Sequence, residues 1–543
     1  MSVPGSAKKQ RLETAASTEA AEDVGHRLQG ASDPVTDMDA TPVVTAEPAT
    51  ESAPAASQPA PKAPESRVQD SMRPYYARLF PTQQMFRWLV YGNDSKHSQA
   101  DTSFPARREF CFTLDGDIFV RYQSFKDASE MQTALERKVP AKIDIGPVYS
   151  VNPAERLKYG ATFVPVEREL VFDIDLTDYD DVRTCGSGGH ICERCWPLMA
   201  VAVKVINTSL RDDFGFKHIL WVYSGRRGVH AWVCDASARR MTDEQRSSVA
   251  NWFGIYKGRE GDKVKLAMFS HNLHPAVSRA AEMLRTAWVE SFLPQQELLA
   301  ESQGQESVLA YLPEDSLREA VRQQWAKQTA RQAAKQTAKQ AAKQAAKPRE
   351  GGAGKPDKVN SEEHWWGGGG PAARHNAFAH ARSCPVLRQV SEEQGRKVNH
   401  DYKVLDPLQR ACNDIIFAHL YPRLDVEVSR KMNHLLKAPF CVHPKTGKVC
   451  IPFDPEHVED FNPCTVPTVK SLLAQLPRNP ASAAAVAAGE GGRVKGEEWR
   501  DTALEPCITF FSSTFCEPLQ RANREEQAEQ ARAKVAGAQS VAW

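Results

Sequence analysis

The stretch E-L-V-F-D-I-D-L, residues 169–176, places two aspartates two positions apart inside an apolar, β-branched run. Because side chains alternate along a strand, Asp173 and Asp175 share one face, with Cα atoms roughly 6.5 Å apart. Two ionised carboxylates side by side repel each other, and burial adds to that cost. Two Mg²⁺ ions, which prefer oxygen ligands and sit about 3.5–4 Å apart in phosphoryl-transfer sites, remove it. The pattern predicts a two-metal site; a solvent-facing strand with two incidental acids is the alternative.

Composition narrows the class of protein. The chain has 543 residues, enough for two or more domains, and a net charge of +1, so any basic surface must be local. Its twelve cysteines are irregularly spaced and no apolar signal segment precedes them, which favours metal binding or core packing in a reducing compartment. No apolar run reaches the roughly 18 residues that a membrane span needs. We expect a soluble intracellular protein.

Changes of composition along the chain predict its organisation. Residues 1–67 are rich in Ala, Pro, Ser, Thr and Glu, which predicts disorder. A K-K-Q-R cluster at residues 8–11 is either a nuclear import signal or a common chance run. The remaining regions are predicted to be a folded domain in two parts, 68–290 and 407–476, a helical insert, 291–406, and a linker with a C-terminal helix, 477–543.

The first part of the folded domain mixes strand and helix patterns. Apolar, β-branched runs predict strands, and Asp115-Gly116 predicts a hairpin turn between the first two. The expected strands are Glu109–Leu114, Ile118–Ser124, Ile143–Tyr149, Leu170–Leu176, Ile219–Tyr223 and Val229–Cys234, and the expected helix is Trp196–Leu210. This mixture indicates an α/β or α+β sheet fold.

The helical insert contains a basic repeat within residues 325–372. Lysine or arginine recurs every four residues in a K-Q-A-A type pattern. Four residues advance a helix by about 400°, so the basic side chains spiral around the axis and no apolar stripe except alanine remains. The repeat is predicted to be a solvated helix or a fluctuating linker, and a nucleic-acid contact is the alternative.

A second polar motif, S-G-R-R-G-V-H at residues 224–230, lies between two predicted strands. Its glycines allow a tight turn, so that Arg226 and Arg227 at the tip present planar forks suited to phosphate oxygens. His230, on the following strand, could donate a hydrogen bond to a triphosphate. A surface hairpin with exposed arginines and a core histidine is the alternative.

A third group of polar residues lies far downstream, between residues 421 and 445. Asp425 could complete a metal site that two acids on one strand cannot close alone. His434, Lys437 and His443 add donors for the phosphates of a nucleotide. Taken alone, these would be ordinary surface residues.

A short cysteine-rich loop follows the acidic strand. Cys185, His190, Cys192 and Cys195 supply four soft ligands within eleven positions, a set that suits tetrahedral Zn²⁺. Redox use is the alternative, but nothing thioredoxin-like surrounds the loop. The sequence therefore predicts a zinc loop.

Three long motifs resemble the small catalytic subunit of eukaryotic DNA primase. They are V-F-D-I-D-L-T-D-Y-D-D-V-R, W-V-Y-S-G-R-R-G-V-H and P-R-L-D-V-x-V-S-x-x-x-N-H-L-L-K-x-P-F-x-V-H-P-K-T-G, and the resemblance spans roughly residues 75–290 and 401–476. It implies a primase-type mixed sheet with flanking helices, a zinc loop and an inserted helical subdomain.

The resemblance also implies roles for individual residues. Asp173, Asp175 and Asp425 would hold two Mg²⁺ or Mn²⁺ ions. Glu109, Arg121 and Asp144 match further active-site positions of the family, with Glu109 grouped with the catalytic acids and Asp144 expected near the ribose. The residues expected to hold the incoming nucleotide are Arg121, Asp144, Ser224, Arg226, Arg227, His230, His434, Lys437 and His443.

One departure from the family pattern concerns the zinc loop. The family often has two adjacent cysteines at the start of this loop, and here the second position is Gly186. Losing one ligand would cripple a tetrahedral site unless another group replaces it. His190 is the candidate, because it lies in the same loop and imidazole commonly binds zinc.

Together these features predict a nuclear primase subunit that makes short RNA primers on single-stranded DNA for the initiation of replication. By resemblance, its partners would be the iron–sulfur large primase subunit and the catalytic and accessory subunits of DNA polymerase alpha. Two other hypotheses remain open: a primase-polymerase acting in damage tolerance, and a non-catalytic scaffold that binds single strands.

Overall fold

The computed structural model describes residues 68–94, 100–260, 263–267, 273–299, 302–312, 314–323, 325–327, 407–477 and 497–541, with single positions at 330, 334 and 337. The described residues all belong to one unit, residues 65–543. Three predictions lie outside the described residues: disorder of 1–67 with its basic cluster, most of the basic repeat in 325–372, and the linker that follows residue 477.

Two antiparallel sheets organise the described chain. The first has strand order β10-β3-β1-β2, with β4 pairing with β3, and the second has order β11-β6-β7-β5; β8 and β9 form a separate ribbon. The strands of the first sheet are β1 Arg108–Leu114, β2 Ile118–Gln123, β3 Lys142–Tyr149, β4 Pro165–Glu167 and β10 Leu436–Lys437. The other strands are β5 Leu170–Asp175, β6 Ile219–Tyr223, β7 Gly228–Val233, β11 Pro452–Phe453, β8 Tyr256–Glu260 and β9 Lys263–Leu266.

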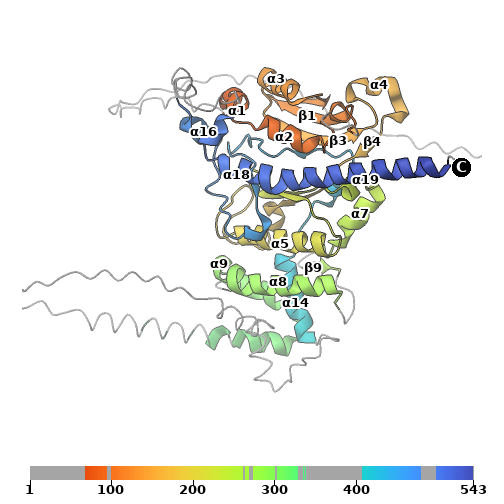
Figure 1. Cartoon of the computed structure of the whole chain (residues 1–543). Helices are drawn as coiled ribbons and strands as arrows, with labels where there is room; N and C mark the ends of the chain where they lie inside the picture. Colours follow the sequence, from red (N-terminus) through yellow and green to blue (C-terminus); the bar gives the residue numbers. More distant parts are fainter. Residues whose placement is uncertain are drawn as a thin grey trace, which may run out of the picture. The chain divides into compact units, whose positions relative to one another are not determined.

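Helices surround both sheets, and Figure 1 shows α1 to α3 beside β1 and β3. The α-helices are α1 Met72–Arg78, α2 Thr82–Leu89, α3 Ala128–Lys138, α4 Arg156–Tyr159, α5 Trp196–Asp212, α6 Ala236–Arg239, α7 Asp243–Trp252, α8 Pro275–Ala287, α9 Leu293–Gln296, α10 Ser302–Leu309, α14 Pro407–Leu420, α15 Val426–Arg430, α16 Val469–Gln475, α18 Glu505–Thr509 and α19 Glu517–Val541. The expected mixed fold is confirmed, and the predicted helix Trp196–Leu210 corresponds to α5. None of the described helices combines the length and apolarity that a membrane crossing requires.

The hairpin between β1 and β2 forms where the sequence predicts it. Three residues separate the paired Leu114 and Ile118, and two of them, Gly116 and Asp117, adopt positive φ angles of +77° and +58°. Along β1, Phe110 and Phe112 are buried against the hydrophobic core, and the residues between them face the opposite side. This alternation directs Glu109 and Cys111 to the face of the sheet that carries Asp144 of β3, because Cys111 pairs with Asp144.

A buried ion-pair network joins the two sheets. Glu169, which immediately precedes β5, is fully buried and accepts two hydrogen bonds of 2.9 Å from the Arg108 guanidinium. Arg168 donates a third at 2.7 Å, and the Tyr91 hydroxyl donates a fourth at 2.5 Å. Burial works to raise the pKa of Glu169, but the two guanidinium groups outweigh it and lower that pKa far below its usual range.

The C-terminal helix is held against the second sheet by aromatic packing and polar contacts. Trp88 of α2 meets Trp232 of β7 edge-on at 5.5 Å and Phe511 at 5.8 Å between ring centroids. Asn523 of α19 accepts a hydrogen bond from the buried Arg239 at 3.1 Å. Figure 1 shows α19 running between the helices around β1 and those around α5. The predicted amphipathic stretch Leu504–Leu519 therefore contributes to the core.

Candidate functional site

The structure confirms the strand that carries the acid pair. β5 is antiparallel to β7, with Asp173 opposite His230 and Asp175 opposite Gly228. Phe172 and Ile174, which alternate with the acids, are fully buried, whereas both aspartates are partly exposed. The alternation thus presents two carboxylates on the same open face.

Asp425 reaches the same face from a distant part of the sequence. Its backbone N–H donates to the carbonyl oxygen of Asp173 at 3.2 Å, so the two residues are direct neighbours. Its carboxylate accepts from the backbone N–H of Glu427 and caps the first turn of α15. Burial, and then repulsion from Asp175 and Asp425, raises the pKa of Asp173 to about 7. The three acids predicted to share metal ions therefore crowd one another.

The carboxylate of Asp175 has a cationic partner in this structure. Arg227 Nε lies 2.8 Å from each of its oxygens, and the backbone N–H of Thr177 donates to one of them at 2.9 Å. Among the described residues, only a set of three cysteines brings three candidate ligand atoms within 4.8 Å of one another, so the three carboxylates do not all lie within that distance of each other. The donor set still fits Mg²⁺ or Mn²⁺, because it consists of carboxylate oxygens whose mutual repulsion a cation relieves.

The S-G-R-R-G turn connects β6 to β7 directly beside the acids. Ser224 closes it in both directions: its N–H donates to the Gly228 carbonyl, and its hydroxyl accepts from the Gly228 N–H at 3.0 Å. Gly225 has φ +83°, and a Cβ added to Gly228 would lie 2.6 Å from the Ile174 carbonyl oxygen. Both glycines are therefore required for the turn to approach β5 this closely.

Cations and histidines collect around this turn. Lys437 Nζ donates to the Ser224 carbonyl at 2.7 Å. Burial, then Lys437 and Arg226, lowers the pKa of His443 to about 3. Burial, followed by Lys437 and Lys142, does the same for His230, whose pKa also falls to about 3. Neutral imidazoles among positive side chains form an environment that favours a polyanion.

His230 itself faces the acids. Its Nε2 atom lies 3.6 Å from Asp173 Oδ1, and its buried Nδ1 atom has no hydrogen-bond partner among the described residues. The ring is therefore placed between the acidic face and the cationic turn.

Residues of the first sheet line the opposite side of the site. Lys437 of β10 pairs in register with Asp144 of β3. Asp144 is ion-paired with Lys142 at 3.0 Å, and burial raises its pKa. Burial, then Arg168, lowers the pKa of His434, whose carbonyl accepts from Arg168 Nε at 3.2 Å. The predicted nucleotide-binding residues of this sheet thus adjoin Lys437.

Glu109 and Arg121 form a pair one strand farther out. The fully buried Glu109 carboxylate accepts two hydrogen bonds from Arg121, at 2.9 and 3.2 Å, and one from the Tyr149 hydroxyl at 3.0 Å. The backbone N–H of Tyr122 adds a fourth donor at 3.3 Å. The described donors to Glu109 therefore come from β2 and from the end of β3.

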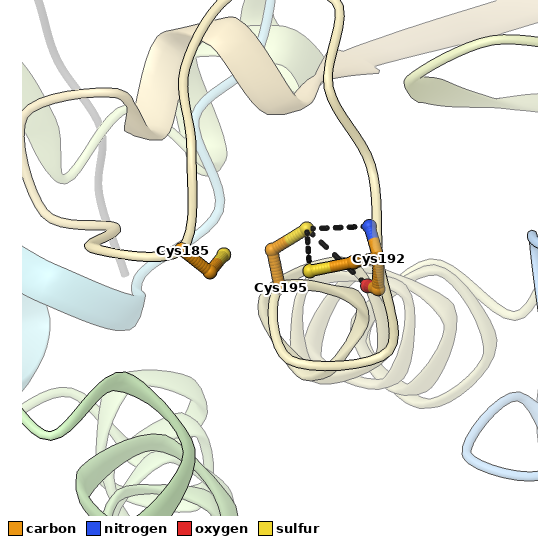
Figure 2. A group of neighbouring side chains, drawn as sticks. All are labelled: Cys185, Cys192 and Cys195. Carbon is orange, nitrogen blue, oxygen red and sulfur yellow. Dashed lines mark hydrogen bonds between the residues drawn. The ribbon is translucent and has the colours of Figure 1, made fainter.

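The cysteine-rich loop gathers three thiols, shown in Figure 2. The ligand atoms of Cys185, Cys192 and Cys195 lie within 4.8 Å of one another, and the last two sulfurs are 3.7 Å apart. Burial raises the pKa of Cys192, but hydrogen bonds from the Cys195 backbone and from His190 outweigh it and bring the value to about 7. Three converging sulfur ligands fit a soft or borderline metal such as zinc.

His190 fills the space left by the missing side chain at position 186. A Cβ added to Gly186 would lie 2.5 Å from His190 Cδ2, and Gly186 has φ +154°. The imidazole is near Cys192 but is not a member of the three-thiol set. The loop also contacts the turn, because a Cβ on Gly189 would lie near the Arg226 guanidinium.

Comparison with known proteins identifies the family. The family model for the DNA primase small subunit matches residues 172–455. The DNA primase small subunit of Schizosaccharomyces pombe is 38% identical over 412 residues, covering 76% of this chain and 78% of that protein. The Drosophila melanogaster and Saccharomyces cerevisiae proteins of the same name are 36% and 32% identical, covering 75% of this chain and 82% and 86% of their own lengths.

The chain belongs to the DNA primase small subunit family. The family match begins at Phe172 and ends at Pro455, so it contains the three aspartates and the S-G-R-R-G turn. Glu109, Arg121 and Asp144 lie before its first residue.

Sequence reasoning about this primase small subunit missed two residues at the site. Burial, then Asp175, raises the pKa of Asp178, which places a fourth acid at the cluster. Lys142 forms the ion pair with Asp144. Each lies two or three residues from a predicted site residue, on the same strand or just beyond its end, and this spacing could have identified it. A separate cavity of about 260 Å³ between α5, α7 and α8 contains none of the predicted site residues.

Proposed function

We propose that this chain is the catalytic subunit of a DNA primase, which joins ribonucleotides into short RNA primers on a single-stranded DNA template. The observation that carries the proposal is the meeting of Asp173, Asp175 and Asp425 beside a cationic turn. The family membership of the chain supports this proposal, because relatives named DNA primase small subunit align over three quarters of the chain.

The acids would hold two Mg²⁺ or Mn²⁺ ions, which lower the pKa of an attacking 3′-hydroxyl and stabilise the departing pyrophosphate. Arg227 now neutralises Asp175, and it would exchange that partner for a phosphate oxygen when cations occupy the carboxylates. Arg226, Lys437 and the neutral His230 would provide fixed charges and a hydrogen-bond donor for the triphosphate. These residues would therefore contribute to catalysis mainly by electrostatic stabilisation of the triphosphate.

Residues of the first sheet would bind and position the nucleotide. Asp144, beside Lys437, is suited to accept from a ribose hydroxyl. We assign Glu109 a positioning role, because all its described donors come from Arg121, Tyr122 and Tyr149. It would hold Arg121 at the edge of the cleft.

Incorporation of labelled ribonucleotides on a poly-pyrimidine template tests the function. We expect metal-dependent RNA synthesis by the wild type and none by Asp173→Ala at an unchanged melting temperature. Full activity of Asp173→Ala would overturn the two-metal assignment. Equal or better use of deoxynucleotides would favour a primase-polymerase instead.

For the cysteine loop, we propose a structural zinc ion held by Cys185, Cys192, Cys195 and His190. The imidazole lies over Gly186 and beside Cys192, which makes His190 the candidate for the fourth ligand. Elemental analysis should give one zinc per wild-type chain and a reduced content for both His190→Ala and Cys192→Ser. Full zinc content in His190→Ala alone would exclude the histidine as the fourth ligand.

We further propose that the subunit works in the nucleus with an iron–sulfur large subunit and with the catalytic and accessory subunits of DNA polymerase alpha. The relatives are named DNA primase small subunits, which supports at least one larger partner. Co-purification of tagged chain from nuclear extract, followed by mass spectrometry, tests this. Recovery of the chain without a larger primase subunit would contradict it.

A further inference from the structure

A group of partly or fully exposed cations and aromatic rings lies around Arg121, at the edge of the residues assigned to the nucleotide. We call it the β2–α4 surface and define it by Arg121, Tyr122, Arg156, Lys158 and Phe163. The guanidinium carbons of Arg121 and Arg156 lie 4.8 and 4.4 Å from the centre of the Tyr122 ring. Figure 1 shows α4, which carries Arg156 and Lys158, at the side of the first sheet near β4.

The strand register connects this surface to the catalytic cleft. Lys437 of β10 pairs with Asp144 of β3, which pairs with Cys111 of β1. Arg121 lies in the next strand, where the β1–β2 pairing shifts register opposite Cys111. Because neighbouring strands are about 4.8 Å apart, Arg121 is two strands, or about 10 Å, from Asp144. The surface therefore begins where the nucleotide-binding residues end.

One buried carboxylate organises the aromatic part of the surface. Glu109 binds Arg121, the Tyr122 N–H and the Tyr149 hydroxyl. Phe163 stacks on Tyr149 with ring centroids 3.9 Å apart and meets Tyr122 edge-on at 6.1 Å. Tyr122 adopts φ +59°, a left-handed conformation that re-aims its side chain at the register shift. The rings are thus held in place rather than left as chance surface residues.

Arg121 is paired with Glu109, but Arg156 and Lys158 have no acidic partner among the described residues. In the described part of the chain, Arg156 contacts only a backbone carbonyl and the Tyr122 ring, and Lys158 contacts the Tyr159 ring. Glu155 is the single acid between residues 152 and 164. Leu157, between the two cations, is 87% exposed. A surface whose charges served only stability would carry acidic partners; this one leaves cations and apolar faces open to solvent.

We propose that the β2–α4 surface binds the single nucleic-acid strand that adjoins the reacting nucleotide. Arg156, Lys158 and Arg121 would contact backbone phosphates, and Tyr122 with its neighbours would support an unstacked base. The chemistry recognised is a phosphodiester strand, which both a DNA template and an RNA primer supply. This inference rests on the proposed function for the position of the strand's reacting end.

The test replaces Arg156 and Lys158 together by glutamine in the full chain. Binding of fluorescein-labelled oligothymidylate and oligouridylate is measured by anisotropy across a series of salt concentrations. Each lost phosphate contact on a single strand should lower the slope of log K against log[salt] by about 0.7, so the double variant should lose about 1.4. A larger loss of slope with oligothymidylate would identify the bound strand as the DNA template, and a larger loss with oligouridylate would identify it as the RNA primer.

The matched control is Arg532→Gln with Lys534→Gln on α19, which have the same spacing and are also exposed. This control should keep the wild-type slope. An unchanged slope in the Arg156→Gln, Lys158→Gln variant would overturn the proposal. Unchanged strand binding with weakened binding of a large primase subunit would also overturn it and would make the surface a protein contact.

Two readouts keep this inference separate from the proposed function. The Arg156→Gln, Lys158→Gln variant should raise the KM for the template–primer several-fold and leave the KM for ribonucleotide unchanged. The same loss of slope should appear when the charge change is made together with Asp173→Ala. If the wild type fails to incorporate nucleotides but the charge change still lowers the slope, the proposed function is contradicted and the proposal for the β2–α4 surface stands.

Discussion

The two ends of β5 carry carboxylates in opposite electrostatic situations. Glu169, just before the strand, is surrounded by Arg108, Arg168 and the Tyr91 hydroxyl, and its pKa is lowered although it is fully buried. Asp173, four residues later, is next to Asp175 and Asp425, and its pKa is raised to about 7. A carboxylate whose fixed donors match its charge belongs to the scaffold. A carboxylate that faces other carboxylates is suited to bind a cation.

The same contrast predicts which substitutions reduce stability and which reduce activity. Breaking a buried ion pair leaves an uncompensated charge inside the protein, so it destabilises the fold. Removing one of several repelling carboxylates relieves repulsion, so it should cost no stability in the absence of metal. The predictions below test this separation from the largest expected effect to the smallest.

The largest effect is expected for Asp425→Asn. Asparagine caps a helix as well as aspartate does, so α15 should keep its first turn while the negative charge is lost. Ribonucleotide incorporation should fall about a thousandfold, as expected for loss of a group that holds the catalytic cations. Steady-state incorporation and circular dichroism melting measure both quantities. A melting temperature lowered in parallel with activity would contradict the separation.

Glu169→Gln should show the opposite behaviour. Glutamine cannot compensate Arg108 and Arg168, so the free energy of unfolding should fall by about 3–5 kcal/mol. Urea unfolding measures the loss, and incorporation per folded molecule should stay near the wild-type value at low temperature. Asp173→Asn, on the same strand, is the matched control and should not be destabilised without metal.

The pH dependence of stability should show that the charge on Glu169 stabilises the fold. A carboxyl whose pKa is lowered by folding contributes stability above its unfolded pKa, about 4.3 for glutamate, and loses it as the pH falls towards the folded value. The stability difference between wild type and Glu169→Gln should therefore be constant near neutral pH and narrow below about pH 4.3. Urea midpoints measured between pH 3 and pH 7, as ~1-unit steps, provide the test. A difference that widens in acid would contradict the assignment.

The smallest effect is expected for Arg227→Lys. In this structure Arg227 Nε contacts both carboxylate oxygens of Asp175. Lysine keeps the positive charge but lacks the planar guanidinium, which is suited to binding phosphate oxygens in pairs. The KM for ribonucleotide should rise about tenfold with little change in stability. Initial-rate kinetics at saturating template measure this, and an unchanged KM would remove Arg227 from the nucleotide site.

Local sequence signals predicted much of the second sheet. β5, β6 and β7 were predicted to within one residue, because each is a run of five or six residues that is apolar apart from the site residues Asp173, Asp175 and His230. The strands β4, β10 and β11, with two or three residues each, escaped prediction because alternation needs a longer run to be visible.

The site was less accessible to local reasoning. The neighbourhood of Asp425 and Asp173 depends on a contact across 252 positions, so local reasoning offered Asp425 only as a candidate ligand and the family resemblance assigned it to the site. The pairing of Arg227 with Asp175 was not predicted, since a turn that presents arginines to phosphate looks the same whether or not an acid lies below it. Arg108 and Arg168 gave no signal, because nothing in their local sequence distinguishes a buried arginine from a surface one.

The packing of α8 against α14 has a practical consequence. Arg285 of α8 donates to Asn413 of α14 at 2.8 Å, so helices from the two sides of the predicted insert are in direct contact. The parts of the chain that supply Asp173 and Asp425 are therefore linked through space as well as along the polypeptide. A reporter or affinity module spliced between residues 328 and 406 would enter the sequence outside every residue assigned to the site.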